Sequence, residues 1–215
     1  MEIYTSIVGF FQSGGFFMYP IMVVLALGTV ISIERYVYLT LARASNQKVW
    51  NQVMPLLEQG DYQRAVNIAE KSKAAIGRIL AYGLARLRTA GHPDAVEMAM
   101  EEGLMESVPR LEKRTHYIAT FANIATLLGL LGTIIGLIQA FTAVSRANPA
   151  EKADMLSASI SVAMNTTAFG LMVAIPLLLI HAVLQTKTTE LIDSLEMASV
   201  KFLNVLTEKT GGQAQ

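Results

Sequence analysis

The chain has no cysteine, and it has no charged residue in two stretches of more than thirty residues each. The absence of cysteine excludes disulfides and thiolate chemistry. Because 17 Lys and Arg residues balance 17 Asp and Glu residues, no excess charge indicates a nucleic-acid partner. The chain also lacks a phosphate-binding loop, a zinc-binding His pair and a Gly-x-Ser-x-Gly elbow. We therefore expect neither an enzyme, nor a metal site, nor a cofactor.

The chain does contain three long apolar segments. Residues 115–145 and 155–186 contain no Asp, Glu, Lys or Arg. Each far exceeds the roughly 18 apolar residues that predict a membrane-spanning helix. A shorter apolar segment, residues 16–33, ends at Glu34 and Arg35. We predict an all-α membrane protein with three transmembrane helices in the lipid bilayer.

The positions of the cations predict the orientation. Of the 17 Lys and Arg residues, 12 lie within residues 34–114 and three within residues 187–215, whereas the loop 146–154 has two. The positive-inside rule places the first two of these regions in the cytoplasm and the loop outside. Residues 1–13 are apolar on one face and are expected to form an amphipathic helix on the outer surface of the membrane. With no Lys or Arg before residue 16, we expect no cleavable signal peptide.

The cytoplasmic region is expected to be helical and to extend the membrane bundle. Asp61 is placed to cap a helix that runs to Lys71, and residues 74–88 are amphipathic. Pro93 suits the first turn of a following helix. The apolar pattern then continues from Asp94 into the second span, with bends expected at Gly103 and Pro109.

Small residues recur along one face of the second and third spans at steps of three and four, which is the spacing of closely packed helices. In the second span they are Ala122, Thr126, Gly129, Thr133, Gly136 and Ala140, with Gly132 beside them, and in the third Ala163, Thr167, Gly170 and Ala174. Ordinary packing explains either face alone. Hydroxyls at matching depth in two helices favour a polar pathway, to which Thr126 and the neighbouring Asn165 and Thr166 would contribute. For Asn165, helix packing is the alternative role. Pro176 is expected to bend the third span.

Several motifs, taken together, resemble the ExbB/TolQ branch of the MotA/TolQ/ExbB ion-channel family. The resemblance covers nearly the whole chain, including the order of the spans. Its motifs are GGFFMYPI at residues 14–21, Ile33-Glu34-Arg35, GLLGT at residues 129–133 with Gly136 and Phe141, TAFGL at residues 167–171 and AIP at residues 174–176.

The resemblance implies a bacterial inner-membrane protein that forms a homopentamer, with the second and third spans around a central pore. The pore would hold the single-span helices of an ExbD/TolR-like dimer, and a TonB/TolA-like transducer would be a further partner. Ion flow would move the partner and deliver work to the cell envelope. The residues that correspond to pore hydroxyls are Thr133 and Thr167.

Two departures from the family pattern leave the ion open. Thr126 stands where proline is usual, and Val162 stands where a glutamate is often found. The spans offer hydroxyls and amides but no carboxylate, so we expect the partner to supply an intramembrane Asp. Neutral oxygens suit sodium, whereas the branch implies protons. The alternatives are a passive membrane scaffold or accessory subunit and, within the family, a flagellar-stator-like subunit, for which four spans would be expected.

Overall fold

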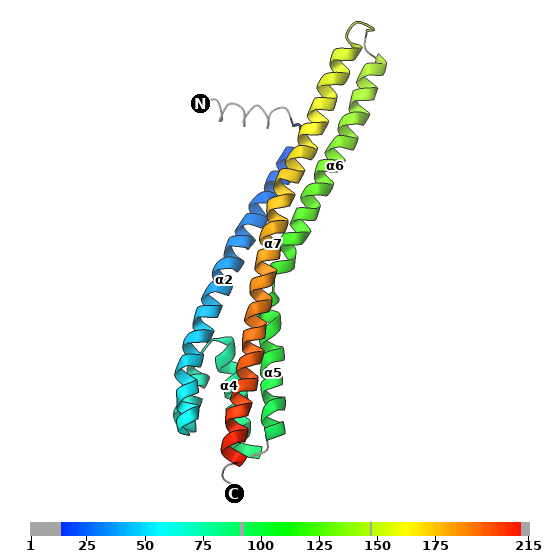
Figure 1. Ribbon diagram of the computed structural model, residues 1–215. Coiled ribbons are helices and arrows are strands. Elements are labelled where there is room, and N and C mark those ends of the chain that lie inside the picture. Colours follow the sequence, from blue (N-terminus) through cyan, green and yellow to red (C-terminus); the bar gives the residue numbers. More distant parts are fainter. Residues whose placement is uncertain (1–13, 91–92, 147, 212–215) are drawn as a thin grey trace, which may run out of the picture. The chain divides into compact units, whose positions relative to one another are not determined.

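The computed structural model describes residues 14–90, 93–146 and 148–211. Within these ranges the chain forms six helices and no strand (Figure 1). The predicted interfacial helix over residues 1–13 lies outside the described residues. The helices are α2 (Met18–Gln59), α3 (Tyr62–Lys71), α4 (Ala75–Ala90), α5 (Pro93–Glu112), α6 (Thr115–Arg146) and α7 (Lys152–Gly211).

Three segments of the described chain are long and apolar enough to cross a membrane, namely Met18–Gln59, Pro93–Ser145 and Lys152–Glu208. This confirms the predicted number of spans. Helix α2 is much longer than the apolar segment 16–33 that it overlaps, and α7 is much longer than the apolar segment 155–186 that it contains. Polar residues therefore continue these helices beyond the stretch that hydropathy can detect.

The junction between α2 and α3 follows from two adjacent residues. Gly60 has a φ of +81°, a conformation that favours glycine, and its N–H donates to the Leu57 carbonyl at 3.1 Å, which ends α2. The Asp61 carboxylate then accepts a hydrogen bond from the backbone N–H of Arg64 at 3.2 Å and caps α3. The predicted cap at Asp61 is confirmed, and α5 begins at Pro93 as predicted.

The helical region that runs from Asp94 into the second span is interrupted at one point. Helix α5 ends at Glu112 and α6 begins at Thr115. Between them Arg114 has a φ of +68°, which a non-glycine residue seldom adopts. An ion pair between Arg114 and Glu34, with N–O distances of 3.2 Å to both carboxylate oxygens, accompanies this turn.

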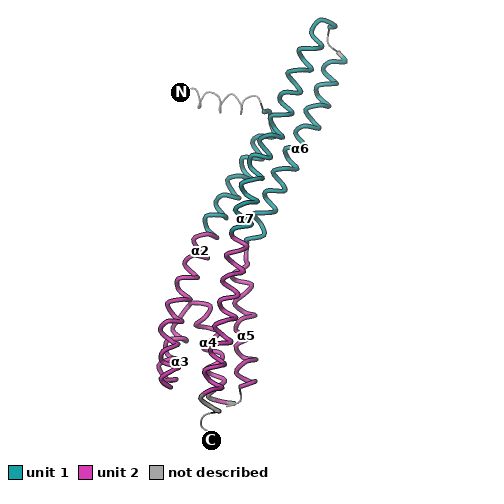
Figure 2. The backbone as a smooth tube through the Cα atoms, in the orientation of Figure 1, with its two compact units in different colours: residues 1–34, 114–183 teal, residues 35–113, 184–215 magenta. Residues whose placement is uncertain are grey.

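The described chain divides into two compact units (Figure 2). Unit 1 comprises residues 14–34 and 114–183 of the described chain, hence the first part of α2, α6 and the first part of α7. Its core contains many small side chains. The buried residues there include Met18, Ile21, Ile118, Ala122, Ala125, Ala140, Ala163, Val173, Ala174 and Leu177.

Unit 2 comprises residues 35–113 and 184–211 of the described chain. Large side chains fill its core, including Leu57, Ile79, Leu80, Leu84, Met100 and Phe202. Two polar residues join its elements. The buried Arg35 donates to the Leu111 carbonyl near the end of α5, and Asn46 accepts from the backbone N–H of Ile76 at 3.2 Å in the first turn of α4.

Candidate functional site

Helices α6 and α7 lie close together where two glycines face each other. A Cβ atom added to Gly170 would lie 2.7 Å from the carbonyl oxygen of Ala125 and 3.1 Å from the Cα of Gly129. A Cβ added to Gly129 would lie 3.2 Å from the Cα of Thr167 and 3.3 Å from that of Gly170. These neighbours are backbone atoms, which cannot turn aside, so only glycine permits this approach.

The close contact continues along α6 on both sides of these glycines. An added Cβ on Gly136 would lie 3.0 Å from the Cβ of Ala163, and one on Gly132 would lie 2.5 Å from the Cγ2 of Thr166. We call this contact the seam. The predicted small residues Gly129, Gly132, Gly136, Ala163 and Gly170 all lie in it, which is the packing arrangement that their spacing indicated.

The hydroxyls of Thr133 and Thr167 meet at the seam. Their Oγ1 atoms are in direct hydrogen-bonding contact. Both also lie within reach of one backbone carbonyl, that of Gly129, at 3.2 Å from Thr133 and 2.9 Å from Thr167. The carbonyl of Ala163 lies 3.3 Å from the Thr133 hydroxyl. The structure thus brings together the two threonines that the sequence singled out.

This group of oxygens carries no formal charge. A threonine hydroxyl has one proton to donate and two lone pairs with which to accept. Because the protons are directed to carbonyls or to the other hydroxyl, lone pairs remain for a hard cation or for a proton carrier such as hydronium. Residues 115–145 and 155–186 contain no carboxylate that could balance a cation here. The site is therefore suited to neutral oxygen ligation and depends on charge from elsewhere.

Thr166, next to Thr167 in α7, directs its methyl group toward Gly132 of the seam, and its hydroxyl has other partners. It is buried, and its hydroxyl lies 2.5 Å from the Gly14 carbonyl and 3.0 Å from the Val162 carbonyl. Both acceptors belong to unit 1, so Thr166 ties α7 to the turn before α2. Asn165 is half-buried and interacts within the chain.

The other predicted residues lie around the seam. Thr126 is exposed, and its hydroxyl donates to the carbonyl of Ala122 at 3.2 Å. Ala125, next to it, is the residue whose carbonyl faces Gly170. Ala140 and Ala174 are buried. Helix α7 is continuous through Pro176, so the bend expected there stays a prediction.

The sequence did not show which residue the turn at Gly14-Gly15, before α2, packs against. Gly15 has a φ of +72°, and a Cβ added to it would lie 3.2 Å from the Cγ1 of Val162. The position where the resemblance led us to expect a glutamate is thus apolar and faces this turn. The Gly14-Gly15 pair was the available signal, but a glycine pair alone does not identify its distant neighbour.

Comparison with known proteins agrees with this geometry. The sequence pattern of the MotA/TolQ/ExbB proton channel family matches residues 71–197, which include both threonines of the pair. The chain belongs to this family. It is 31% identical over 186 residues to the biopolymer transport protein ExbB-like 1 of Synechocystis, covering 85% of this chain and 72% of that protein.

Other relatives of this MotA/TolQ/ExbB protein come from distant organisms. An ExbB homologue named as a biopolymer transport protein, from Methanothermobacter thermautotrophicus, is 26% identical over 92% of this chain and 69% of its own length. The Tol-Pal system protein TolQ of Haemophilus influenzae is 29% identical over 57% of each chain. Family membership makes the chain a membrane-embedded subunit of a channel or transport complex and not an enzyme, as the sequence predicted.

Proposed function

We propose that this protein is the ion-conducting subunit of an inner-membrane motor of the ExbB–ExbD or TolQ–TolR kind, which couples ion-motive force to mechanical work or transport at the cell envelope. The observation that carries the proposal is the Thr133–Thr167 pair above the Gly129 carbonyl. A passive scaffold would need the glycine seam, but it would have no need for converging hydroxyls inside spans that lack every charge.

The proposed assembly is a homopentamer around the single-span helices of an ExbD/TolR-like dimer. The outer faces of the spans support association, because large apolar side chains remain exposed on α6 of the single chain, where they can face lipid, other copies or the partner. They include Leu127, Leu130, Ile134, Ile138 and Phe141. The partner would contribute an intramembrane Asp, and a TonB/TolA-like protein would transmit the movement.

In this proposal, the neutral threonine oxygens can pass a cation only together with the carboxylate of the partner. A bare cation in hydrocarbon is costly, and a nearby Asp offsets its charge or carries a proton itself. The threonine oxygens would then replace water around the ion as it passes. We propose protons as the transported ion because the family is a proton channel family, and sodium is the alternative that neutral oxygens favour.

The test is ion flux in vesicles that contain the chain together with its partner. At a fixed membrane potential, the proposal predicts proton uptake that follows the proton gradient and is unchanged when sodium is replaced by choline. If the flux requires sodium, the transported ion is sodium and not the proton. No flux of either ion, with the complex intact by mass, would contradict ion conduction and leave the scaffold alternative.

We propose that residues 35–113 and the C-terminal part of α7 lie in the cytoplasm and that the loop at residues 146–154 lies in the periplasm. Because the chain has no cysteine, a single introduced cysteine is the only thiol, and its labelling reports on which side of the membrane that position lies. In intact spheroplasts an impermeant thiol reagent should label Ala150→Cys and leave Gln59→Cys unlabelled until the membrane is opened. Both positions are exposed. Labelling of Gln59→Cys in intact spheroplasts would reverse the orientation.

A further inference from the structure

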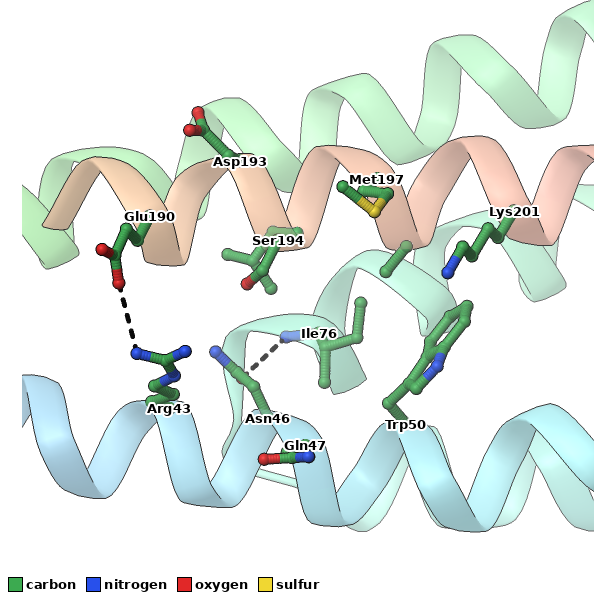
Figure 3. Close-up of a pocket in the computed structure, with 12 residues that line it drawn as sticks. Arg43, Asn46, Gln47, Trp50, Ile76, Glu190, Asp193, Ser194, Met197 and Lys201 are labelled. Atoms are coloured by element: carbon green, nitrogen blue, oxygen red, sulfur yellow. Dashed lines mark hydrogen bonds and ion pairs between the residues drawn. The ribbon is translucent and has the colours of Figure 1, made fainter. Parts of the chain in front are cut away.

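Unit 2 contains a cavity of about 590 Å³ between α2, α7 and the start of α4. This volume lies within the range of about 300–1,000 Å³ that is typical of small-molecule sites. Apolar side chains from all three helices line it, among them Trp50, Ile76 and Leu195. Figure 3 shows these elements bordering the space. Nothing in the proposed ion pathway uses this cavity, whose lining belongs to unit 2 alone.

A buried amide faces this cavity without a protein acceptor. Asn46 is 6% exposed, and its Oδ1 accepts from the backbone N–H of Ile76. Its Nδ2 is buried and has no hydrogen-bond partner among the described residues. In Figure 3 the amide points from α2 into the space enclosed with α7. A buried donor is costly unless an oxygen accepts from it, so this position calls for an acceptor such as a carbonyl group.

The charges around the cavity differ between its two ends. At one end Arg43 and Glu190 form an ion pair at 3.2 Å and neutralise each other. At the other end lie Trp50 and Lys201, and Lys201 has no ion-pair partner in the described part of the chain. The Asp193 carboxylate points away from the cavity in Figure 3. The Trp50 end therefore favours an anionic group beside an apolar or aromatic body.

We propose that this cavity binds a small amphipathic acid that also carries an internal carbonyl, the chemistry of an N-acylated amino acid. The carbonyl accepts from the Nδ2 of Asn46. The carboxylate lies near the ammonium of Lys201, and the apolar body contacts Trp50, Ile76 and Leu195. Each part of the ligand thus meets a group in the cavity that has a complementary chemical property.

Trp50 is the single tryptophan of the chain, so its fluorescence reports directly on the cavity. The probe is N-acetylphenylalanine, titrated into the purified full-length protein in lipid nanodiscs. Two analogues each remove one feature, since N-acetylphenylalanine amide lacks the negative charge and 3-phenylpropanoate lacks the internal carbonyl. The expected result is a saturable change in Trp50 emission with the acid, and binding weaker by about tenfold for either analogue.

Asn46→Asp is the sharpest variant, because it keeps an oxygen for the Ile76 N–H and removes the free donor. It should weaken binding of the acid by at least about tenfold. Lys201→Gln should also weaken it and should abolish the preference for the acid over its amide. The matched control is Lys48→Gln, which removes an exposed lysine of α2 that does not line the cavity and should leave binding unchanged.

Ala198→Met keeps the proposal testable if Asn46→Asp fails to fold, since it leaves Asn46 intact and fills the cavity from α7. Loss of the saturable response in this variant supports the site. The proposal is overturned if the unaltered protein shows no saturable response, as expected for a cavity filled by water or covered by a second copy of the chain. Equal affinity in all four variants would overturn it as well.

Discussion

The two units use opposite kinds of side chain to hold their helices together. In unit 1 the contact between α6 and α7 depends on the smallest residues, and a Cβ atom on Gly170 would meet backbone at 2.7 Å. In unit 2 the core depends on large ones, such as Phe202 and Met100, which are almost fully buried. We therefore expect added atoms at the α6–α7 contact to harm unit 1 most and removed atoms in the core to harm unit 2 most.

The surroundings that we propose for the two units, lipid for unit 1 and water for unit 2, would account for this difference. Lipid tails are as apolar as leucine, so large side chains in a membrane gain little by leaving lipid for a helix contact. Close backbone approach then supplies the packing. In water the burial of large apolar side chains is the main favourable term, about 25 cal/mol per Å². The glycine seam of unit 1 and the large-residue core of unit 2 are the packing expected in lipid and in water, respectively.

The largest effect is expected from Gly170→Leu, which tests whether the packing of unit 1 depends on its glycines. Its side chain would collide with the backbone of Ala125 and Gly129, so α6 and α7 must separate along the whole seam. We expect most of the assembled complex and of the recovered partner to be lost, measured by native mass and co-purification. Gly136→Leu should act in the same direction.

The control for this substitution is Gly83→Ala in unit 2. Its new Cβ would also be crowded, at 2.6 Å from the Cγ of Met100, but a flexible methionine side chain can move aside. Assembly should therefore survive Gly83→Ala and fall in Gly170→Ala. If the complex assembles equally well with Gly83→Ala and with Gly170→Ala, the proposed difference between the units is contradicted.

The reciprocal prediction concerns Phe202→Ala. This side chain is fully buried in unit 2, so its removal should lower the free energy of unfolding of that unit by about 3–5 kcal/mol. Hydrogen exchange should accelerate in α4 and the end of α7 and stay unchanged in α6. Phe202→Leu, which keeps most of the volume, is the milder control, and an unaltered exchange rate in Phe202→Ala would contradict the large-residue core.

A smaller effect is expected from Asp61→Ala at the start of α3. Loss of the hydrogen bond to the Arg64 N–H should destabilise this helix by about 1 kcal/mol. The exposed ion pair between the same residues, at 3.3 Å, adds little. Asp61→Asn retains the capping oxygen without the charge. If it lowers the protection of α3 amides as much as alanine does, charge rather than capping is responsible.

Local signals predicted much of this structure. Hydropathy gave the number of spans, and the chemistry of Asp61 and Pro93 gave two helix starts that the structure reproduces. The steps of three and four placed Thr133 and Thr167 on facing sides, and they meet. These features depend on residues that are close in sequence, or on the spacing of three and four residues that places side chains on one face of a single helix.

Other features depended on contacts that no local pattern contains. Ala125 and Thr126 are both small, so their spacing could not show that Ala125 faces α7 and Thr126 does not. The turn at Arg114 uses a conformation rare for arginine, and Glu34, its partner, is distant in sequence. Thr166 likewise faces Gly14, 152 positions away.

The most direct test of the proposed ion pathway is ion flux after each threonine of the pair is replaced by valine. Valine keeps the shape of threonine and removes one hydroxyl, so the complex should form with normal recovery of the partner. The matched control is Thr142→Val, whose exposed hydroxyl donates only to its own helix, to the Ile138 carbonyl at 2.8 Å. We predict that Thr133→Val and Thr167→Val each lower flux per complex by about tenfold or more, whereas Thr142→Val does not. Flux at the level of the unaltered protein in both valine variants, with the complex intact, would contradict the account.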